Sequence, residues 1–268
     1  MLQIEHLSKT FNPGTVNEKK ALTDLNLVLD DGDFATIVGS NGAGKSTLFN
    51  AIAGSFYADE GFIELDGEDI TFVKEHVRSH YIGRLFQDPL MGTAPHMTIE
   101  ENLSVAYLRA SGRTRGIFSR TGKKEKELFR EQLALLNMGL EDRMSNPVGL
   151  LSGGQRQALT LLMATIVTPK ILLLDEHTAA LDPATADKVM ALTKQIIAER
   201  KISCLMVTHN MQSALDLGSR TIMMDRGRII FDVAGKEREG LTIQDLLEQF
   251  KLAAGKVLDN DRMLLGVE

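Results

Sequence analysis

The sequence predicts an α/β protein with a parallel sheet and a helical insertion, and three observations lead to this prediction. Short continuous apolar runs, such as residues 34–38 and 171–174, are typical of strands buried on both faces. After residue 169 such runs alternate with segments of helical apolar spacing, which favours parallel strands covered by helices. Helical spacing dominates residues 99–167, so we expect a largely helical block inserted in one α/β domain.

The individual elements follow in chain order. The first 37 residues alternate apolar and polar positions and carry the turn signals NPG and DDGD, which predict short strands. A strand and turn are expected at residues 61–70, and a further strand at 81–88. Beyond the helical block, the pattern predicts strands at 171–176, 202–209, 221–225 and 228–233 and helices at 184–200, near 211–218 and at 241–252. We expect the tail, residues 255–268, to be loosely ordered.

Composition narrows the function classes. The formal net charge of -6 over 268 residues argues against nucleic acid as the main partner. The single cysteine, Cys204, lies in an apolar run, which predicts a buried and inert thiol. The longest apolar stretches are shorter than the roughly 18 residues that a membrane helix needs, and the N-terminus lacks the apolar core of a signal peptide. We therefore expect a soluble protein that docks on membrane proteins without spanning the bilayer.

The segment GSNGAGKS at residues 39–46 predicts a phosphate-binding loop. It matches G-x-x-x-x-G-K-[ST] and lies between a buried strand and a helix, as this motif requires. Glycines let the backbone N–H groups surround a β-phosphate, Lys45 adds a positive charge, and the Ser46 hydroxyl suits a Mg²⁺ ion. An ordinary glycine-rich turn is the less favoured alternative, because strand, loop, Lys-Ser pair and helix occur together. The predicted nucleotide-binding residues are Gly39, Ser40, Asn41, Gly42, Ala43, Gly44, Lys45, Ser46 and Thr47.

Acidic and polar residues stand where other predicted strands end. Asp175 and Glu176 close the run ILLLDE, at the end of a parallel strand where ligands bind. Asp175 suits a Mg²⁺ shell, and Glu176 suits the orientation of an attacking water. His209 ends the strand VTH and Gln87 ends YIGRLFQ, although either residue taken alone is more often structural.

The segment LSGGQ at residues 151–155 has two interpretations. Ser152 with Gln155 three positions later matches a helix capping box. Two glycines at a helix start also leave backbone amides for an anion. Since one chain needs a single phosphate loop, the second set of amides makes sense if it serves a neighbouring chain.

The order of GSNGAGKS, FQD, LSGGQ, ILLLDE, AALD and VTH resembles that in ATPase subunits of ABC transporters, over about residues 1–235. This resemblance implies a P-loop NTPase (RecA-like) core with an N-terminal antiparallel β subdomain and an inserted α-helical subdomain. It implies an ATPase domain at residues 1–240 with the insert at about 88–168, and a C-terminal helix and tail at 241–268.

The resemblance also implies a role for each matching residue, with ATP and Mg²⁺ as cofactors. Phe11 stacks on adenine, Glu176 is the catalytic glutamate and His209 contacts the γ-phosphate beside Lys45. Gln87, with Ser46, senses Mg²⁺ and connects to the transmembrane partner. The residues expected to contact the nucleotide of a second chain are Ser152, Gly153, Gly154, Gln155 and Asp182.

One residue departs from the family pattern, and one further stretch is unusual in its charge. His177 follows the catalytic acid where the family commonly has Pro. This residue either tunes the electrostatics beside Glu176, or contacts a partner, or is a tolerated loop substitution, which we favour. Residues 109–126 hold seven Lys or Arg and a single acid, which indicates a solvated surface or a contact with anionic lipid headgroups.

The motifs and their flanking residues are similar in sequence to those of ATPases from bacterial importers associated with amino-acid-type substrate-binding proteins. We expect a dimer of two copies closed around two ATP, membrane permease subunits, a substrate-binding protein reached through the permease, and no nucleic acid. The expected location is the cytoplasmic face of the inner membrane, as a peripheral protein. A soluble ABC-type ATPase not coupled to transport, for example of the iron–sulfur assembly type, remains the alternative.

Overall fold

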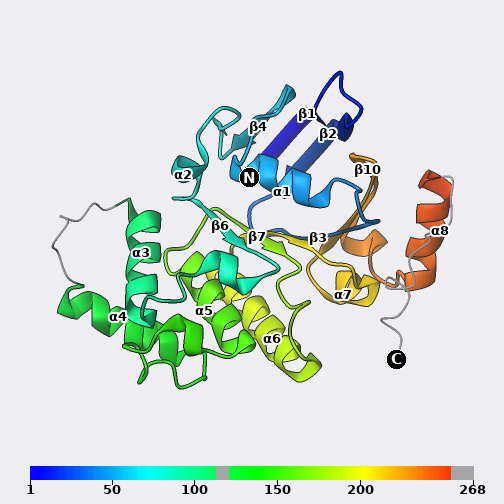
Figure 1. The fold of residues 1–268 in the computed structure, drawn as a ribbon. Coiled ribbons are helices and arrows are strands. Elements are labelled where there is room, and N and C mark those ends of the chain that lie inside the picture. Colours follow the sequence, from blue (N-terminus) through cyan, green and yellow to red (C-terminus); the bar gives the residue numbers. More distant parts are fainter. Residues whose placement is uncertain (113–120, 255–268) are drawn as a thin grey trace. The chain divides into compact units, whose positions relative to one another are not determined.

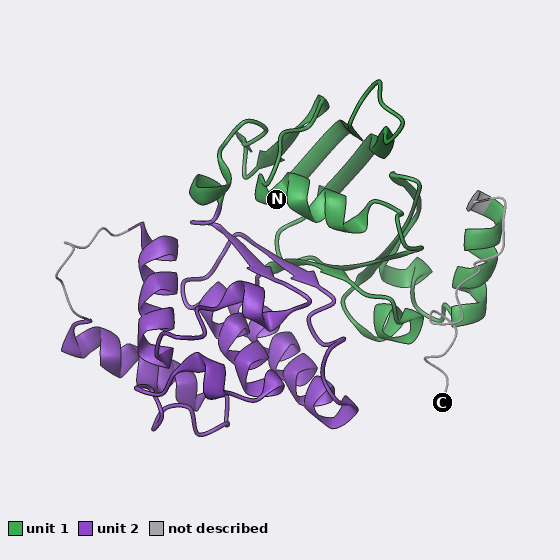
Figure 2. Cartoon of the chain, in the orientation of Figure 1, with its two compact units in different colours: residues 1–78, 203–268 green, residues 79–202 purple. Residues whose placement is uncertain are grey.

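The computed structural model describes residues 1–112 and 121–254 and divides the chain into two compact units (Figures 1 and 2). Unit 1 comprises residues 1–78 and 203–268, and unit 2 comprises residues 79–202. The middle of the basic stretch and the predicted loose tail, residues 113–120 and 255–268, lie outside the described residues.

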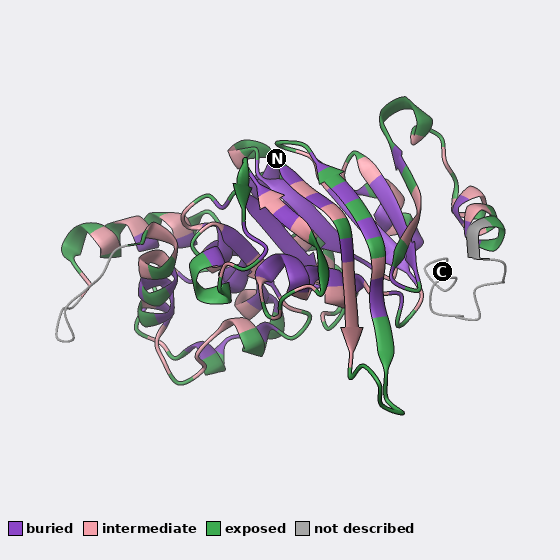
Figure 3. Cartoon of the chain, turned by 90° about the horizontal axis from the view of Figure 1, so that it is seen from above, coloured by how far each residue is buried: buried purple, intermediate pink, exposed green. Residues whose placement is uncertain are grey.

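An antiparallel sheet forms the N-terminal part of unit 1. Leu2 at the start of one strand pairs with Leu29 on one side and Leu65 on the other. Buried positions are interspersed with more exposed ones along these strands (Figure 3), as expected for a sheet with one covered face. The buried residues are mostly leucine and isoleucine. The strand order is β2 (Lys19–Leu29), β1 (Leu2–Phe11), β4 (Glu60–Leu65) and β5 (Glu68–Asp69). The implied antiparallel β subdomain is therefore present.

Unit 1 also holds parallel strands. Strand β3 (Phe34–Gly39), buried along nearly its whole length, pairs in parallel with β8 (Ser203–Val207) and β9 (Arg220–Asp225). The antiparallel strand β10 (Arg228–Ala234) borders β9. Continuous apolar runs thus become doubly covered parallel strands, which confirms the α/β class predicted from the sequence.

Helices in unit 1 begin close to the strand ends. They are α1 (Lys45–Ala53), α2 (Glu75–Arg78), α7 (Met211–Asp216), the 3₁₀ helix η3 (Gly235–Glu237) and α8 (Ile243–Ala254). Leu246 and Phe250 of α8 pack in one cluster with Val38, Met211 and Met223, so the predicted C-terminal amphipathic helix belongs to this core.

A fully buried arginine closes the far end of α1. The Arg78 guanidinium donates to the carbonyl oxygens of Ala51 and Ile52 in the last turn of α1, at 2.8 Å each, and to those of Thr71 and Val73. The carbonyls of Ala51 and Ile52 lie in the last turn of the helix, where helical donors run out, and Ala51 O also accepts from Gly54 N–H at 3.2 Å. The phosphate-loop helix is therefore fixed at the end opposite its glycines.

Unit 2 combines two parallel strands with most of the helices. Strand β6 (Ile82–Leu85) pairs with β7 (Ile171–Asp175). The helices are η1 (Pro89–Gly92), α3 (Ile99–Ser111), α4 (Lys123–Ala134), η2 (Val148–Leu150), α5 (Gly153–Thr165) and α6 (Pro183–Arg200). Apolar side chains of α3, α4 and α5, among them Leu103, Phe129 and Leu159, form its core.

The helical block is less continuous than its periodicity predicts. Between α4 and α5 the chain runs through turns and the short helix η2. Asn137 and Gly139 have φ angles of 52° and 66°, in the left-handed region that ends helices. The spacing of apolar residues alone does not predict this interruption of the helix.

Two predictions from composition can be compared directly with the structure. Cys204 is buried and in no disulfide, as predicted, and burial raises the pKa of its thiol well above the usual value, which disfavours the reactive thiolate. Within residues 1–112 and 121–254, no helix has both the length and the apolar character required to span a bilayer.

Candidate functional site

The phosphate loop follows directly from β3 and ends in α1, both in unit 1. Gly44 begins the helix with φ 104°, and a Cβ there would lie 2.7 Å from the carbonyl oxygen of Ala21. Glycine is therefore required at this position for both conformation and space. The loop is closed by Ala43 N–H donating to Ser40 O at 3.1 Å and by Gly227 N–H donating to Ala43 O at 2.8 Å.

Lys45 lies inside this loop, with only 6% of its surface exposed. Its ammonium donates to the carbonyl oxygens of Gly39 at 2.7 Å and Ser40 at 3.1 Å. The side chain thus points back over the loop that the nucleotide phosphates would fill. The predicted phosphate-binding loop and the Lys45 ammonium therefore lie together.

The start of α1 fits a phosphate group. Gly44 supplies no side-chain cap, and the first turn of α1 contains no acidic residue. Helices α3, α5, α6 and α7 instead begin with a side chain that accepts a backbone N–H. Since the first N–H groups of a helix have no partner within it, the uncapped end of α1 suits an anionic ligand.

The residues present also fit Mg²⁺, provided that phosphate oxygens complete its shell. Ser46 is exposed at the start of α1. In the described part of the chain, no group of three or more His, Cys, Asp or Glu side chains is placed to hold a metal by itself. Mg²⁺ commonly binds through one or two protein oxygens plus substrate phosphates and water.

Phe11, predicted to stack on adenine, ends β1 in unit 1. Its ring meets that of Phe56 edge to face, with the ring centroids 5.3 Å apart. The Lys9 ammonium lies within 5.7 Å of both ring centroids. The Phe56 ring therefore supports the Phe11 ring by an edge-to-face contact. The sequence motifs did not identify Phe56.

The register of β8 brings His209 to the phosphate loop. Val207 pairs with Ile37 of β3, so His209, two residues later, lies at the level of Gly39 where the loop begins. Thr208 N–H donates to Ile37 O at 3.1 Å and extends this pairing toward His209. The structure therefore brings together the loop, Lys45 and His209 within unit 1.

A second group of predicted residues lies in unit 2. Leu174 pairs with Leu85 in parallel register, which puts Glu176 at the level of Gln87 just beyond the two strand ends. Asp175 is the last residue of β7, and Glu176 has a φ of 46°, which turns the chain sharply. Gln87 is exposed, and Asp175 and Glu176 are half-buried.

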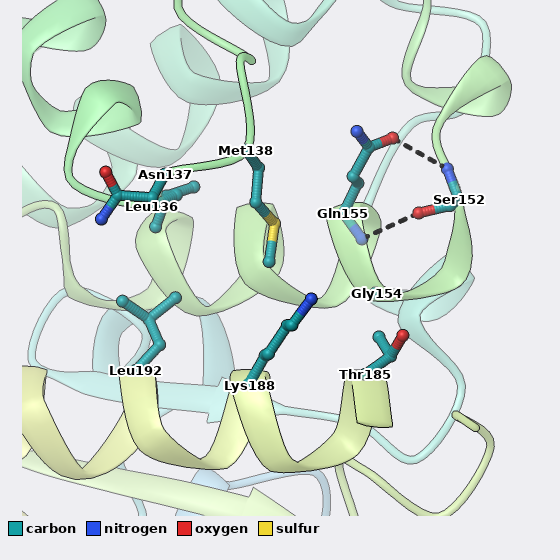
Figure 4. Close-up of a pocket in the computed structure, with 9 residues that line it drawn as sticks. All are labelled: Leu136, Asn137, Met138, Ser152, Gly154, Gln155, Thr185, Lys188 and Leu192. Carbon is teal, nitrogen blue, oxygen red and sulfur yellow. Dashed lines mark hydrogen bonds between the residues drawn. The ribbon is translucent and has the colours of Figure 1, made fainter. Parts of the chain in front are cut away.

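The LSGGQ segment forms the capping box that the sequence predicts. Ser152 Oγ accepts from Gln155 N–H at 3.2 Å, and Gln155 Oε1 accepts from Ser152 N–H at 3.2 Å (Figure 4). A hydroxyl can accept and donate at once, so Ser152 retains its own proton for another acceptor. The N–H groups of Gly153 and Gly154 lie in the first helical turn, where a helix offers no acceptor. The capping and anion interpretations are therefore compatible.

The glycines of LSGGQ have a second physical reason. A Cβ at Gly154 would lie 2.1 Å from Cγ2 of Thr185, and one at Gly153 would lie 3.3 Å from Leu181. At Gly154, α5 thus approaches the first turn of α6 so closely that the Thr185 side chain would have to move to admit a Cβ. Sequence reasoning assigned these glycines to ligand contact and missed their packing role.

A pocket of about 430 Å³ lies beside this helix start (Figure 4). Its described lining includes a cation, Lys188, and no acidic residue. The lining residues are Leu136, Asn137, Met138, Ser152, Gly154, Gln155, Thr185, Lys188 and Leu192.

Asp182, the last predicted residue, is the N-cap of α6. Its carboxylate accepts from Thr185 N–H at 3.1 Å, and the hydrogen bonds with Thr185 lower the pKa of Asp182 below its usual value. Asp182 therefore has a structural role in its own unit, whether or not a second chain reaches it.

His177, the residue that departs from the family pattern, is buried with 1% of its surface exposed. Its Nε2 lies 3.2 Å from Thr193 Oγ1 of α6, and burial lowers its pKa from 6.5 to about 4. The His177 side chain therefore packs inside unit 2 and offers almost no surface to a partner protein. Thr193 carries no sequence signal, because it lies sixteen residues away in the chain.

The pKa of His177 predicts a pH dependence of stability. Between pH 6.5 and 4 the unfolded chain binds a proton at this residue that the folded chain does not, so stability falls as the pH falls. Between neutral pH and pH 4, urea denaturation should show the wild-type free energy of unfolding falling by up to about 3 kcal/mol more than that of His177→Gln. Parallel profiles for the two proteins would contradict a neutral, buried imidazole.

Comparisons with known proteins agree with this geometry. A family model described as ABC transporter matches residues 22–179, more than half of the chain. The tyrosine transport ATP-binding protein of Clostridioides difficile strain R20291 is 44% identical over 254 residues, covering 94% of this chain and 100% of that protein. The phosphonates import ATP-binding protein of Lactococcus lactis subsp. cremoris strain SK11 is 33% identical over 245 residues, covering 88% and 94%.

Solved structures lead to the same family. A dimeric ATP-binding cassette in a post-hydrolysis state, bound to ADP and Pi, matches with a TM-score of 0.73 and 28% identity, covering 87% of this chain and 98% of that one. The resemblance drawn from the motif order is therefore confirmed. The chain belongs to the ABC transporter family, among its ATP-binding ATPase subunits.

Proposed function

We propose that this chain is the ATP-hydrolysing motor of a bacterial importer, acting as a dimer that closes around two ATP and drives a membrane permease. The observation that carries the proposal is the pair of helix starts described above. Helix α1 begins without a side-chain cap beside a buried lysine, and α5 begins with a cap that leaves donors available. The first suits the phosphates of a nucleotide held in the same chain, and the second suits the γ-phosphate of a neighbour's nucleotide.

In the proposed reaction each chain supplies half of two sites. Lys45 exchanges its contacts with the loop carbonyls for the β- and γ-phosphate oxygens, and Phe11 stacks on adenine. Mg²⁺, when bound, neutralises charge that develops on the phosphates, and Ser46, Gln87 and Asp175 are the residues that would hold it.

Hydrolysis itself requires an oriented water. Glu176 holds and polarises this water, and His209 donates a hydrogen bond to the γ-phosphate. From the second chain, Ser152 donates its hydroxyl proton, Gly153 and Gly154 donate backbone N–H groups, and Gln155 and Asp182 border the nucleotide. Loss of the γ-phosphate removes these contacts, so the closed dimer loses its differential stabilisation and opens.

The cargo is proposed from the relatives. The tyrosine transport protein is similar over its whole length, and the phosphonate import protein is similar at lower identity. We therefore propose an amino acid of the aromatic type as cargo, with a permease and a substrate-binding protein as partners. The chain then acts as a peripheral protein at the cytoplasmic face of the membrane, with the permease contacting the region of Gln87 and the helices of unit 2.

Replacing the catalytic glutamate tests the motor. Glu176→Gln should retain ATP binding and lower the rate of phosphate release by at least about a hundredfold, since the carboxylate that polarises water is lost. Size-exclusion chromatography with ATP and Mg²⁺ should then detect a stable dimer. Glu131→Gln, at an exposed position of α4, is the matched control. Wild-type turnover in Glu176→Gln would remove Glu176 from its assigned role.

Mixing two inactive chains tests the shared site. Lys45→Ala should lose nucleotide binding, and Ser152→Ala with Gly153→Asp should lose the contact to the neighbour's phosphate. A mixed dimer rebuilds one intact site, so an equal mixture should recover up to about a quarter of wild-type activity. Recovery that never exceeds the two parents would leave LSGGQ as a helix cap alone.

Purification from membranes tests the transport assignment. A tagged chain should bring permease subunits with it in detergent, and the reconstituted complex should hydrolyse ATP faster when tyrosine-loaded binding protein is added. Phosphonate-loaded binding protein is the comparison suggested by the second relative. Purification without any membrane subunit would instead favour a soluble ATPase.

A further inference from the structure

The hydrogen bonds around His177 determine which ring nitrogen carries the proton. Thr193 Oγ1 donates its single proton to Val189 O at 2.8 Å, one turn back along α6. The same oxygen lies 3.2 Å from His177 Nε2, where it must therefore accept. Nε2 carries the proton, and Nδ1 presents a lone pair.

The lone pair on Nδ1 argues against a role for His177 as a mere filler of space in the core. His177 Nδ1 is buried, and no described residue donates to it. A buried acceptor without a partner costs about 1–3 kcal/mol, which an apolar residue of similar size would avoid. The interaction that favours an imidazole at this position is the hydrogen bond from Nε2–H to Thr193 of α6.

The segment that His177 anchors begins at a strained residue. Glu176 has a φ of 46°, a conformation that costs a residue with a side chain about 1–3 kcal/mol unless its surroundings hold it. Ala179 N–H donates to Glu176 O at 2.9 Å, and Leu181 N–H donates to Thr178 O at 3.1 Å. The segment then joins α6 through the Asp182 cap. The His177 contact ties the beginning of the segment to the middle of the same helix.

We propose that His177 is a positioning residue for Glu176, holding the glutamate's backbone in its left-handed turn through the hydrogen bond from Nε2–H to Thr193. A proline would restrict the backbone at this position by its ring. Here a buried side chain anchored to α6 does so instead. The inference rests on the proposed function, because it takes Glu176 as the residue that orients water.

Removing only the acceptor tests the proposal. Thr193→Val keeps the shape of the side chain but cannot accept from His177, and it should lower kcat by about tenfold or more while KM for ATP changes by less than about twofold. Thr193→Ser retains the hydroxyl and should restore kcat. His177→Gln, which can carry an N–H to a similar position, should retain more activity than His177→Leu.

The matched control is Thr165→Val in α5. Thr165 is equally buried and donates to a carbonyl one turn back, Leu161 O at 2.8 Å. Its substitution removes the same kind of hydroxyl from the same unit without touching His177. Urea denaturation of both variants measures stability separately from turnover.

A double-mutant cycle decides whether the effect passes through Glu176. In the Glu176→Gln background, Thr193→Val should cause no further loss in single-turnover hydrolysis. An equal loss in both backgrounds, or a kcat for Thr193→Val no lower than for Thr165→Val, overturns the positioning role. If Glu176→Gln itself keeps wild-type turnover, the proposed function fails as well, so the two failures are distinguishable.

Discussion

The backbone N–H groups at helix starts are the constraint on which the rest of this structure depends. Each helix leaves its first donors without an internal acceptor, and the chain satisfies them in two ways. Side chains cap α3, α5, α6 and α7, whereas α1 begins at Gly44 with neither cap nor acid. The uncapped helix follows β3, a parallel strand that is buried along nearly its whole length. The start of α1 therefore suits an anionic ligand, which would accept hydrogen bonds from these donors.

The close approach of chain segments at glycines is a second constraint, and it links ligand binding to packing. Gly44 meets the carbonyl of Ala21, and Gly154 meets the side chain of Thr185. In both cases a glycine to which we assign ligand contact also lets two chain segments touch. A larger residue would shift the segments as well as block the ligand. Loss of activity on substituting these glycines therefore reports on packing and binding together.

The residues to which we assign roles in hydrolysis are distributed over both compact units. Lys45 and His209 belong to unit 1, whereas Gln87, Glu176 and the LSGGQ helix belong to unit 2. Within each unit, parallel register brings the relevant strand ends to one level, as with β3 and β8, paired up to Ile37 and Val207, and β6 and β7, paired up to Leu85 and Leu174. The proposed reaction requires contributions from both units and from a second chain, which makes hydrolysis sensitive to closure.

Most of the architecture could be predicted from local information. Motif order, apolar runs and turn signals determined the α/β class, the phosphate loop, the capping box and the family, because each depends on residues near in the chain. Periodicity did not predict the break at Asn137 and Gly139, since left-handed turns leave no apolar pattern. Only the tertiary structure decided the rest: the packing role of Gly154, the support of Phe11 by Phe56, and the burial of His177 against Thr193. In each case two segments that are distant in the sequence pack against each other. Burial and hydrogen-bond partners depend on this packing, so no local sequence pattern encodes them.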